Sequence, residues 1–423
     1  MLRFLLLTSA LSSAVAMAQV LAPETPSELG ARFVKLIIAK KSDEAVRLFS
    51  QEVQEQLPRT MIDKAWAHHT GGLGAFQKSV EMMRRPMGEK EVIVHRVEFE
   101  RGAVTTYVTV NKRTLQIEGF QLKPVPKDFV SADYVKAGAF HAEEIAFGFK
   151  DFALPATLLI PEGEGKFPAG VLVHGSGPND RDESIGANKP FRDLAEGLAS
   201  RGVLVLRYDK RTFTHGSKMA NPTIDTEVID DAVAAVQLLR NRPDVDPKRL
   251  VVVGHSLGAL LAPQIAKVSG ASGAVMLAPP ARTPWAILPQ QYRFLKVPEE
   301  EVAVIEKKLF AVRDGKSQEA VLGAPAEYWR DWASRNGIAV AKALNIPMLV
   351  MRGDRDYQVI AEDFAAWKKG LAGMKKVKLV EVPGANHLFI VGTGKPSPAE
   401  YEIPGHVAAG VVTAIADFVT ASP

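Results

Sequence analysis

One serine stands in a setting that indicates chemistry. Ser256 is the centre of Gly254-His255-Ser256-Leu257-Gly258, a G-x-S-x-G pattern that follows an apolar run and precedes a stretch with helical spacing. A serine on such a strained strand-to-helix turn is lifted out of the sheet, and the flanking glycines avoid clashes with neighbouring backbone. The turn also directs the Leu257 N–H toward the place where an oxyanion would form. The pattern predicts Ser256 as a nucleophile and Leu257 as one oxyanion-hole donor.

A serine hydroxyl reacts well only when a base takes its proton, so a histidine must come from elsewhere in the fold. The chain has nine histidines. We favour His387, because residues 377–383 have the pattern of a last major strand and His387 follows in the loop that leaves its carboxyl end. With it, the triad order along the chain is serine, acid, histidine. His215 and His406 are weaker alternatives.

The acid that orients this histidine must follow the serine, precede the histidine and leave a strand end. Gly353-Asp354-Arg355-Asp356 meets these conditions. Asp356 lies three residues beyond Gly353, far enough for its carboxylate to turn toward the imidazole, so we predict Asp356 as the acid. We expect Asp354 to hold the turn by accepting hydrogen bonds from backbone N–H groups.

An oxyanion hole needs a second donor, usually from the loop after an earlier strand. Residues 172–178, Leu-Val-His-Gly-Ser-Gly-Pro, follow an apolar run, and glycine lets the backbone approach a substrate closely. We predict the Ser176 N–H as this donor. His174 is expected to brace the loop rather than to transfer protons.

Short apolar runs that alternate with helical stretches must position these residues. Runs rich in valine and leucine indicate the buried strands of a parallel sheet, and helices between them, such as residues 225–241, indicate the α/β class. The predicted strands are residues 170–174, 203–208, 250–254, 273–277, 348–352 and 377–382.

One interval of about sixty residues is longer than a crossover between strands requires. We predict a helical cap at about residues 280–345, with helix-like segments at 299–313 and 326–344. The cap would emerge at the carboxyl edge of the sheet. Trp329 and Trp332 are therefore predicted to line an acyl pocket. The alternative is an ordinary surface insertion whose aromatic side chains pack on one another.

The first part of the chain has a different pattern. Residues 27–67 show helical spacing, whereas residues 91–123 alternate apolar and polar side chains around likely hairpin turns at Arg101-Gly102 and Lys112-Arg113. Helices followed by an antiparallel meander predict a small α+β domain at residues 19–126. Residues 127–423 form the second domain.

The amino-terminal residues have the layout of a cleavable secretory signal. Arg3 precedes an apolar stretch, and small residues at Ala16 and Ala18 precede Gln19. We predict a signal peptide at residues 1–18 and an exported protein, periplasmic or secreted. The alternative, a membrane anchor, is disfavoured because the run falls short of the roughly 20 residues that cross a bilayer.

Composition narrows the function classes. Net charge is +4, from 52 basic and 48 acidic residues that are dispersed, so nucleic acid is not an expected partner. The absence of cysteine excludes a thiol nucleophile, disulfides and a thiolate metal site. We expect no metal and no cofactor.

The motifs together resemble a known family. Besides the serine motif they comprise residues 174–182 (HGSGPNDRD), 207–211 (RYDKR), 353–358 (GDRDYQ) and Asn386-His387. Nearly the whole chain after residue 18 is similar to bacterial α/β-hydrolase esterases of the dienelactone-hydrolase-like kind. Some of these carry an amino-terminal DUF3887 domain, and residues 19–126 look like DUF3887 and NTF2-like modules.

The resemblance implies an α/β-hydrolase fold and hydrolysis of carboxylic esters, with a small-molecule ester as substrate. Ser256, Asp356 and His387 match the family's triad position by position. Two alternatives remain open: a serine peptidase or amidase with the same triad, and a catalytically inactive binding protein. The resemblance implies no chemistry for the amino-terminal domain.

Overall fold

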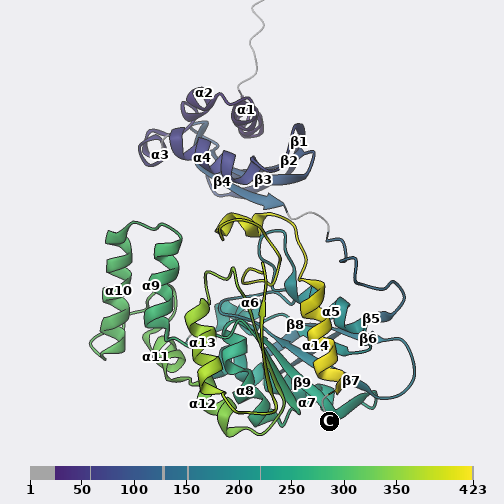
Figure 1. The fold of residues 1–423 in the computed structure, drawn as a ribbon. Coiled ribbons are helices and arrows are strands. Elements are labelled where there is room, and N and C mark those ends of the chain that lie inside the picture. Colours follow the sequence, from purple (N-terminus) through teal and green to yellow (C-terminus); the bar gives the residue numbers. More distant parts are fainter. Residues whose placement is uncertain (1–23, 58, 126–128, 150–151, 220, 422–423) are drawn as a thin grey trace, which may run out of the picture. The chain divides into compact units, whose positions relative to one another are not determined.

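The chain divides into two compact units on either side of the bond between Val125 and Pro126. The computed structural model describes residues 24–421 except 58, 126–128, 150–151 and 220 (Figure 1). The predicted signal peptide, residues 1–18, lies outside the described residues. Within the described ranges, no helix has the length and apolar character needed to cross a membrane.

The amino-terminal unit packs helices on one face of an antiparallel sheet. The buried face carries alternate residues of its strands, such as Ile93, Val97 and Val108, and these contact Phe33 and Phe49 from the helical layer. The helices are α1 (Pro26–Ile38), α2 (Ser42–Val46), α3 (Gln51–Gln56) and α4 (Arg59–Thr70). The strands, in sheet order, are β1 (Phe76–Met87), β2 (Lys90–Phe99), β3 (Gly102–Asn111) and β4 (Gln116–Val125).

Strand β1 was not predicted. It is an edge strand, and most of its side chains are exposed on both faces, so the sequence shows no alternation of apolar and polar residues there. Pro86 also argues against a strand by pattern alone, because a proline is tolerated only at an edge or a bulge.

The second unit contains an eight-stranded sheet in the order β12-β11-β10-β9-β7-β8-β6-β5. Strands β5 and β6 form an antiparallel hairpin, and β6 pairs antiparallel with β8, while the remaining pairs are parallel. The strands are β5 (Phe140–Phe149), β6 (Phe152–Pro161), β7 (Phe167–Val173), β8 (Leu204–Tyr208), β9 (Val245–His255), β10 (Gly273–Leu277), β11 (Met348–Gly353) and β12 (Val377–Val382).

Helices cover both faces of this sheet (Figure 1). One face is buried by α5 (Pro190–Ala199) and α14 (Ala409–Ala421), and the other by α7 (Asp230–Arg240), α8 (Leu257–Ser269) and α13 (Ala361–Gly370). Short segments complete the order: α6 (Arg211–His215), the 3-10 helices η1 (Gly216–Lys218) and η3 (Pro398–Glu402), and the π-helix η2 (Asp225–Ile229). The predicted α/β-hydrolase fold, preceded by a small α+β domain, is confirmed.

The predicted cap is helical and lies between β10 and β11. Its helices are α9 (Pro284–Phe294), α10 (Glu299–Arg313), α11 (Ala326–Ser334) and α12 (Gly337–Ala343). Residues 326–344 therefore form two helices rather than one helical stretch. The chain leaves the helical conformation at Arg335, and the Asn336 side chain then caps α12 by accepting from the Ala339 N–H at 3.0 Å.

Candidate active site

The carboxyl ends of β9 to β12 lie at one edge of the sheet. His255 at the end of β9 pairs with Leu277 of β10, which pairs with Met351 of β11, and the pairing continues into β12. Residues that follow these strands therefore emerge together, which is where open α/β sheets bind ligands. Ser256, Asp356 and His387 all leave this edge.

Ser256 sits on a strained turn between β9 and α8. Its φ of 52° and ψ of −117° are uncommon for a residue with a side chain. The motif's glycines are required sterically: a Cβ on Gly254 would lie 2.2 Å from the Gly258 carbonyl oxygen, and one on Gly258 would lie 2.3 Å from the Val173 oxygen. The turn leaves Ser256 partly exposed, while its neighbours His255 and Leu257 are buried.

Asp356 and His387 form a buried pair. His387 Nδ1 and Asp356 Oδ2 are 2.6 Å apart. The other carboxylate oxygen of Asp356 accepts from the Gln358 N–H at 2.8 Å and from the Val359 N–H at 2.9 Å. These bonds fix the carboxylate, and through it the orientation of the imidazole. Asp354 instead accepts from the Gly384 N–H at 2.7 Å and so ties the two loops together.

Ser256 and His387 are brought to the same edge, and no hydrogen bond joins their side chains within the described chain. His255, the residue before Ser256, contacts His387 directly. Its Nε2 lies 2.9 Å from the His387 carbonyl oxygen, and the two ring centroids are 4.6 Å apart. Catalytic hydrogen bonds often tighten only when substrate binds.

Neither predicted oxyanion donor, Leu257 or Ser176, has a backbone hydrogen-bond acceptor among the described residues. The Leu257 N–H is the first of α8 and has no acceptor within the helix. On the loop after β7, the Gly175 N–H is occupied, because it donates to Glu183 Oε1 at 2.6 Å. The next amide, Ser176, donates to no acceptor in the described part of the chain. A Cβ on Gly175 would lie 3.1 Å from the Cβ of Ser256, so this loop adjoins the serine.

A buried ion pair beside the site was not predicted from the sequence. His255 Nδ1 lies 2.9 Å from Glu183 Oε2, and both side chains are almost fully buried. Burial alone would lower the pKa of His255, but Glu183 outweighs it and raises this pKa. Burial would likewise raise the pKa of Glu183, but His255 holds it below the ordinary value. Glu183 also has a φ of 50°, a strained conformation that its contacts maintain.

His174 stabilises the loop after β7. Its Nε2 lies 3.0 Å from the Asp180 carbonyl oxygen, and its ring packs against Phe191 and Tyr208. Burial lowers the pKa of His174 to about 4, so the ring is neutral near pH 7.

Trp329 and Trp332 lie inside the cap rather than at an open surface. They are 6% and 7% exposed, stack with centroids 5.9 Å apart, and belong to the main hydrophobic cluster of the unit. Trp329 Nε1 donates to the Val321 carbonyl oxygen at 2.9 Å. Their contact with an acyl group stays a prediction.

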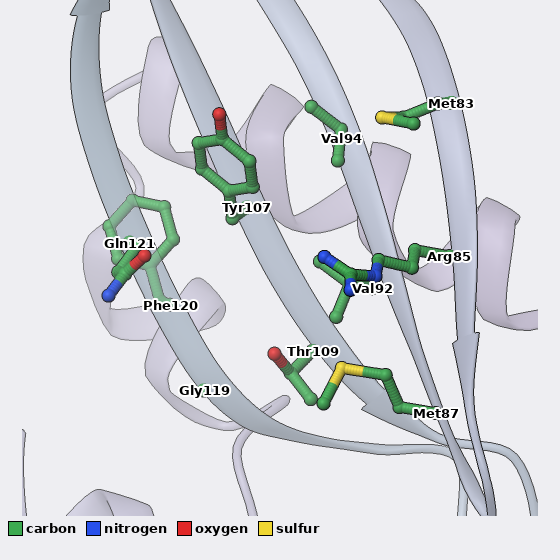
Figure 2. A pocket seen from close by; sticks show the side chains of 10 residues that line it. All are labelled: Met83, Arg85, Met87, Val92, Val94, Tyr107, Thr109, Gly119, Phe120 and Gln121. Carbon is green, nitrogen blue, oxygen red and sulfur yellow. The ribbon is translucent and has the colours of Figure 1, made fainter. Parts of the chain in front are cut away.

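The amino-terminal unit has a hollow of its own, with a volume of about 530 Å³. Figure 2 shows its side chains, with Met83, Arg85 and Met87 on β1 and Tyr107 and Thr109 on β3. None of the described residues that line it is a histidine or carries a carboxylate. Across the described residues of both units, no cluster of histidine and acidic side chains has the arrangement of a metal site.

The comparisons with known proteins define the class. A sequence model of the alpha/beta hydrolase family matches residues 171–401, which include the serine, aspartate and histidine described above. The chain therefore belongs to the α/β-hydrolase family. The resemblance of residues 19–126 to DUF3887 and NTF2-like modules stays a prediction.

Three named proteins show the similarity in detail. Esterase EstD of Thermotoga maritima is 39% identical over 391 residues, which cover 91% of this chain and 93% of EstD. YfhR of Salmonella typhimurium is 33% identical over 121 residues, 28% of this chain and 38% of YfhR. Among solved structures, Est1E from Butyrivibrio proteoclasticus has a TM-score of 0.45 and 19% identity, and covers 66% of this chain and 97% of Est1E.

Proposed function

We propose that this protein is a serine hydrolase that cleaves carboxylic esters through an acyl-enzyme. The hydrogen bond between His387 and Asp356, beside a strained Ser256 at the same sheet edge, is the observation that carries the proposal. The esterase name of EstD, a relative along nearly the whole chain, supports an ester as substrate.

In the proposed reaction, Ser256 Oγ attacks the ester carbonyl carbon while His387 Nε2 takes the hydroxyl proton. The carbonyl oxygen becomes an oxyanion that accepts from the Leu257 and Ser176 N–H groups. Collapse expels the alcohol, which receives the proton from His387. A water molecule, deprotonated by His387, then releases the carboxylic acid and restores the serine. Asp356 stays ionised and stabilises the imidazolium.

Apart from substrate and water, the steps use only side chains and amides of this chain, and we propose that no metal or cofactor takes part. We also propose that residues 1–18 direct export to the periplasm or the medium. For the acyl pocket, the cap residues Trp329 and Trp332 are the proposed wall.

A panel of p-nitrophenyl esters, run beside aminoacyl anilides, tests the substrate class. We expect turnover of the esters, no effect of EDTA, and faster cleavage of esters than of anilides. Preferential cleavage of anilides would point to a peptidase or amidase, and no turnover by folded protein would point to a binding protein. Cell fractionation with and without residues 1–18 tests export.

A further inference from the structure

Lys210 is a buried lysine that the reaction above does not use. It belongs to the RYDKR motif and follows β8, and it is 2% exposed. Its Nζ donates to the carbonyl oxygens of Gly175 at 2.7 Å and Gly177 at 3.0 Å, and to Glu227 Oε1 at 2.5 Å. Each of the three N–H groups of the ammonium therefore has an acceptor, and two of these acceptors belong to the loop that carries Ser176.

The bond to Gly175 sets the direction of the Ser176 N–H. The Gly175 carbonyl and the Ser176 N–H belong to one planar trans peptide unit, in which the oxygen and the hydrogen point in opposite directions. Because the ammonium holds the Gly175 oxygen on one side, the Ser176 N–H must point away from Lys210. The positive charge also polarises this peptide, which strengthens its N–H as a donor.

Glu227 links the same ammonium to the cap. Glu227 lies on η2, and its side chain and that of Lys210 are 5% and 2% exposed. Helix α11 of the cap carries the buried Tyr328 and, three residues later, Asp331, whose Oδ2 accepts from the Ile224 N–H beside η2 at 3.0 Å. Burial and then the negative charge of Glu227 raise the pKa of Tyr328, so its hydroxyl stays protonated near pH 7.

A buried ion pair is weak evidence for stability, because apolar residues of similar volume often stabilise a core as well or better. The three aligned donors of Lys210 instead fix the geometry of one loop. We propose that Lys210 is the positioning residue of the oxyanion hole, and that Glu227 and Tyr328 make its geometry depend on the cap. This assignment rests on the proposed esterase function.

The first test compares Lys210→Met and Tyr328→Phe with the unmodified protein, using p-nitrophenyl acetate. Rates are normalised to the serines that a fluorophosphonate titrates, so that unfolded protein does not count. Loss of one oxyanion donor reduces rate by about 10²–10³-fold, so we expect a displaced donor to cost about 30-fold in kcat/KM for Lys210→Met. Tyr328→Phe, which keeps the ring, should cost about threefold.

The second readout is inhibition by a phenyl trifluoromethyl ketone, which forms a tetrahedral oxyanion with a catalytic serine. The inhibition constant should rise by the same factor as kcat/KM falls, because both depend on oxyanion binding. A role in folding alone would lower the melting temperature and leave both normalised quantities unchanged.

Matched controls come from the same unit. Asp231→Asn breaks the ion pair between Arg211 and Asp231, which is as buried as that between Lys210 and Glu227, and serves as the control for Lys210→Met. Tyr134→Phe removes a buried hydroxyl distant in sequence from the cap and is the control for Tyr328→Phe. Both controls should keep the normalised kcat/KM.

If Lys210→Met misfolds, the double variant Lys210→Met/Glu227→Gln leaves no unpaired charge and replaces it in the assay. Unchanged kcat/KM and inhibition constants per titrated serine, in an unmodified protein that hydrolyses esters, would overturn the assignment of Lys210. Absence of ester hydrolysis in the unmodified protein would instead overturn the proposed function, and the assignment with it.

Discussion

The two sheets of this molecule differ in what covers them. The amino-terminal sheet is buried on one face only, and its other face carries exposed Met83 and Met87 around an open hollow (Figure 2). The sheet of the second unit is covered on both faces by helices, and its buried charged residues, such as Glu183, Lys210 and Asp356, gather near its carboxyl edge. Complete burial makes charged groups expensive, so they persist where their partners fix them. The contrast explains why acid–base chemistry is proposed for the second unit alone.

The largest effect is expected from the acid. Asp356→Asn should keep the fold and reduce kcat by about 10⁴-fold, because an amide no longer holds the catalytic tautomer of His387. Asp354→Asn should cost less than about tenfold, since the Asp354 carboxylate accepts from the Gly384 N–H and an amide oxygen can accept the same bond. Steady-state kinetics with circular dichroism as the fold control decides between them, and a greater loss for Asp354→Asn would reverse the assignment.

The next largest effect is expected from replacing a cap tryptophan. Trp329 is 6% exposed and packed in the main cluster, so Trp329→Ala should lower the free energy of unfolding by about 3–5 kcal/mol. A purely structural role predicts equal losses for acetate, butyrate and octanoate esters. Greater loss for the longer esters, measured at a temperature where the variant is folded, would establish the predicted acyl pocket, since each buried methylene contributes about 0.8 kcal/mol.

His174 and His255 should make the free energy of unfolding depend on pH in opposite directions. The pKa of His174 is lowered to about 4 from 6.5, so its contribution is present above pH 6.5 and is lost as pH falls toward 4. The pKa of His255 is raised above 6.5, so its contribution is present below pH 6.5 and is lost as pH rises through the raised value.

Urea unfolding across pH tests this pair, with a slope of up to about 1.4 kcal/mol per pH unit for each group. His174→Gln should flatten the acid limb alone, and His255→Gln the alkaline limb alone. The same change in both limbs from either variant would contradict the assigned pKa directions.

The smallest effect is expected on the open face of the amino-terminal sheet. Met87 is 56% exposed, so Met87→Ser should change the free energy of unfolding by less than about 0.5 kcal/mol and leave ester turnover unchanged. Val108 lies on the buried face of the same sheet, and Val108→Ser should cost more than about 2 kcal/mol. A fall in turnover for Met87→Ser would show that the open face takes part in the reaction.

Much of the fold was accessible from sequence, because central parallel strands bury both faces and read as continuous apolar runs. Residues 273–277 match β10 in full, and residues 348–352 match β11 except for its last residue. The hairpin of β5 and β6 was missed. It lies at the edge of the sheet, and the exposed residues of β5 and the prolines of β6 weaken the pattern.

A site residue could be predicted from the sequence where the residues around it form a recognisable local pattern. Ser256 has its glycines, and Asp356 and His387 follow apolar strands, so the order of strands brings them to one edge. The pair of Glu183 and His255 has no such signal, because its contact depends on the register between β7 and β9, in which Val173 pairs with Gly254. Contacts that depend on strand register and burial therefore could not be predicted from the pattern of residues in the sequence.

Covalent trapping of Ser256 tests the central claim most directly. A fluorophosphonate should label the unmodified protein once, and peptide mass spectrometry should place the adduct on Ser256, because this reagent needs an activated serine. Ser256→Ala should lose both the label and ester turnover while keeping its melting temperature. An adduct on another residue, or turnover that survives in folded Ser256→Ala, would contradict the account.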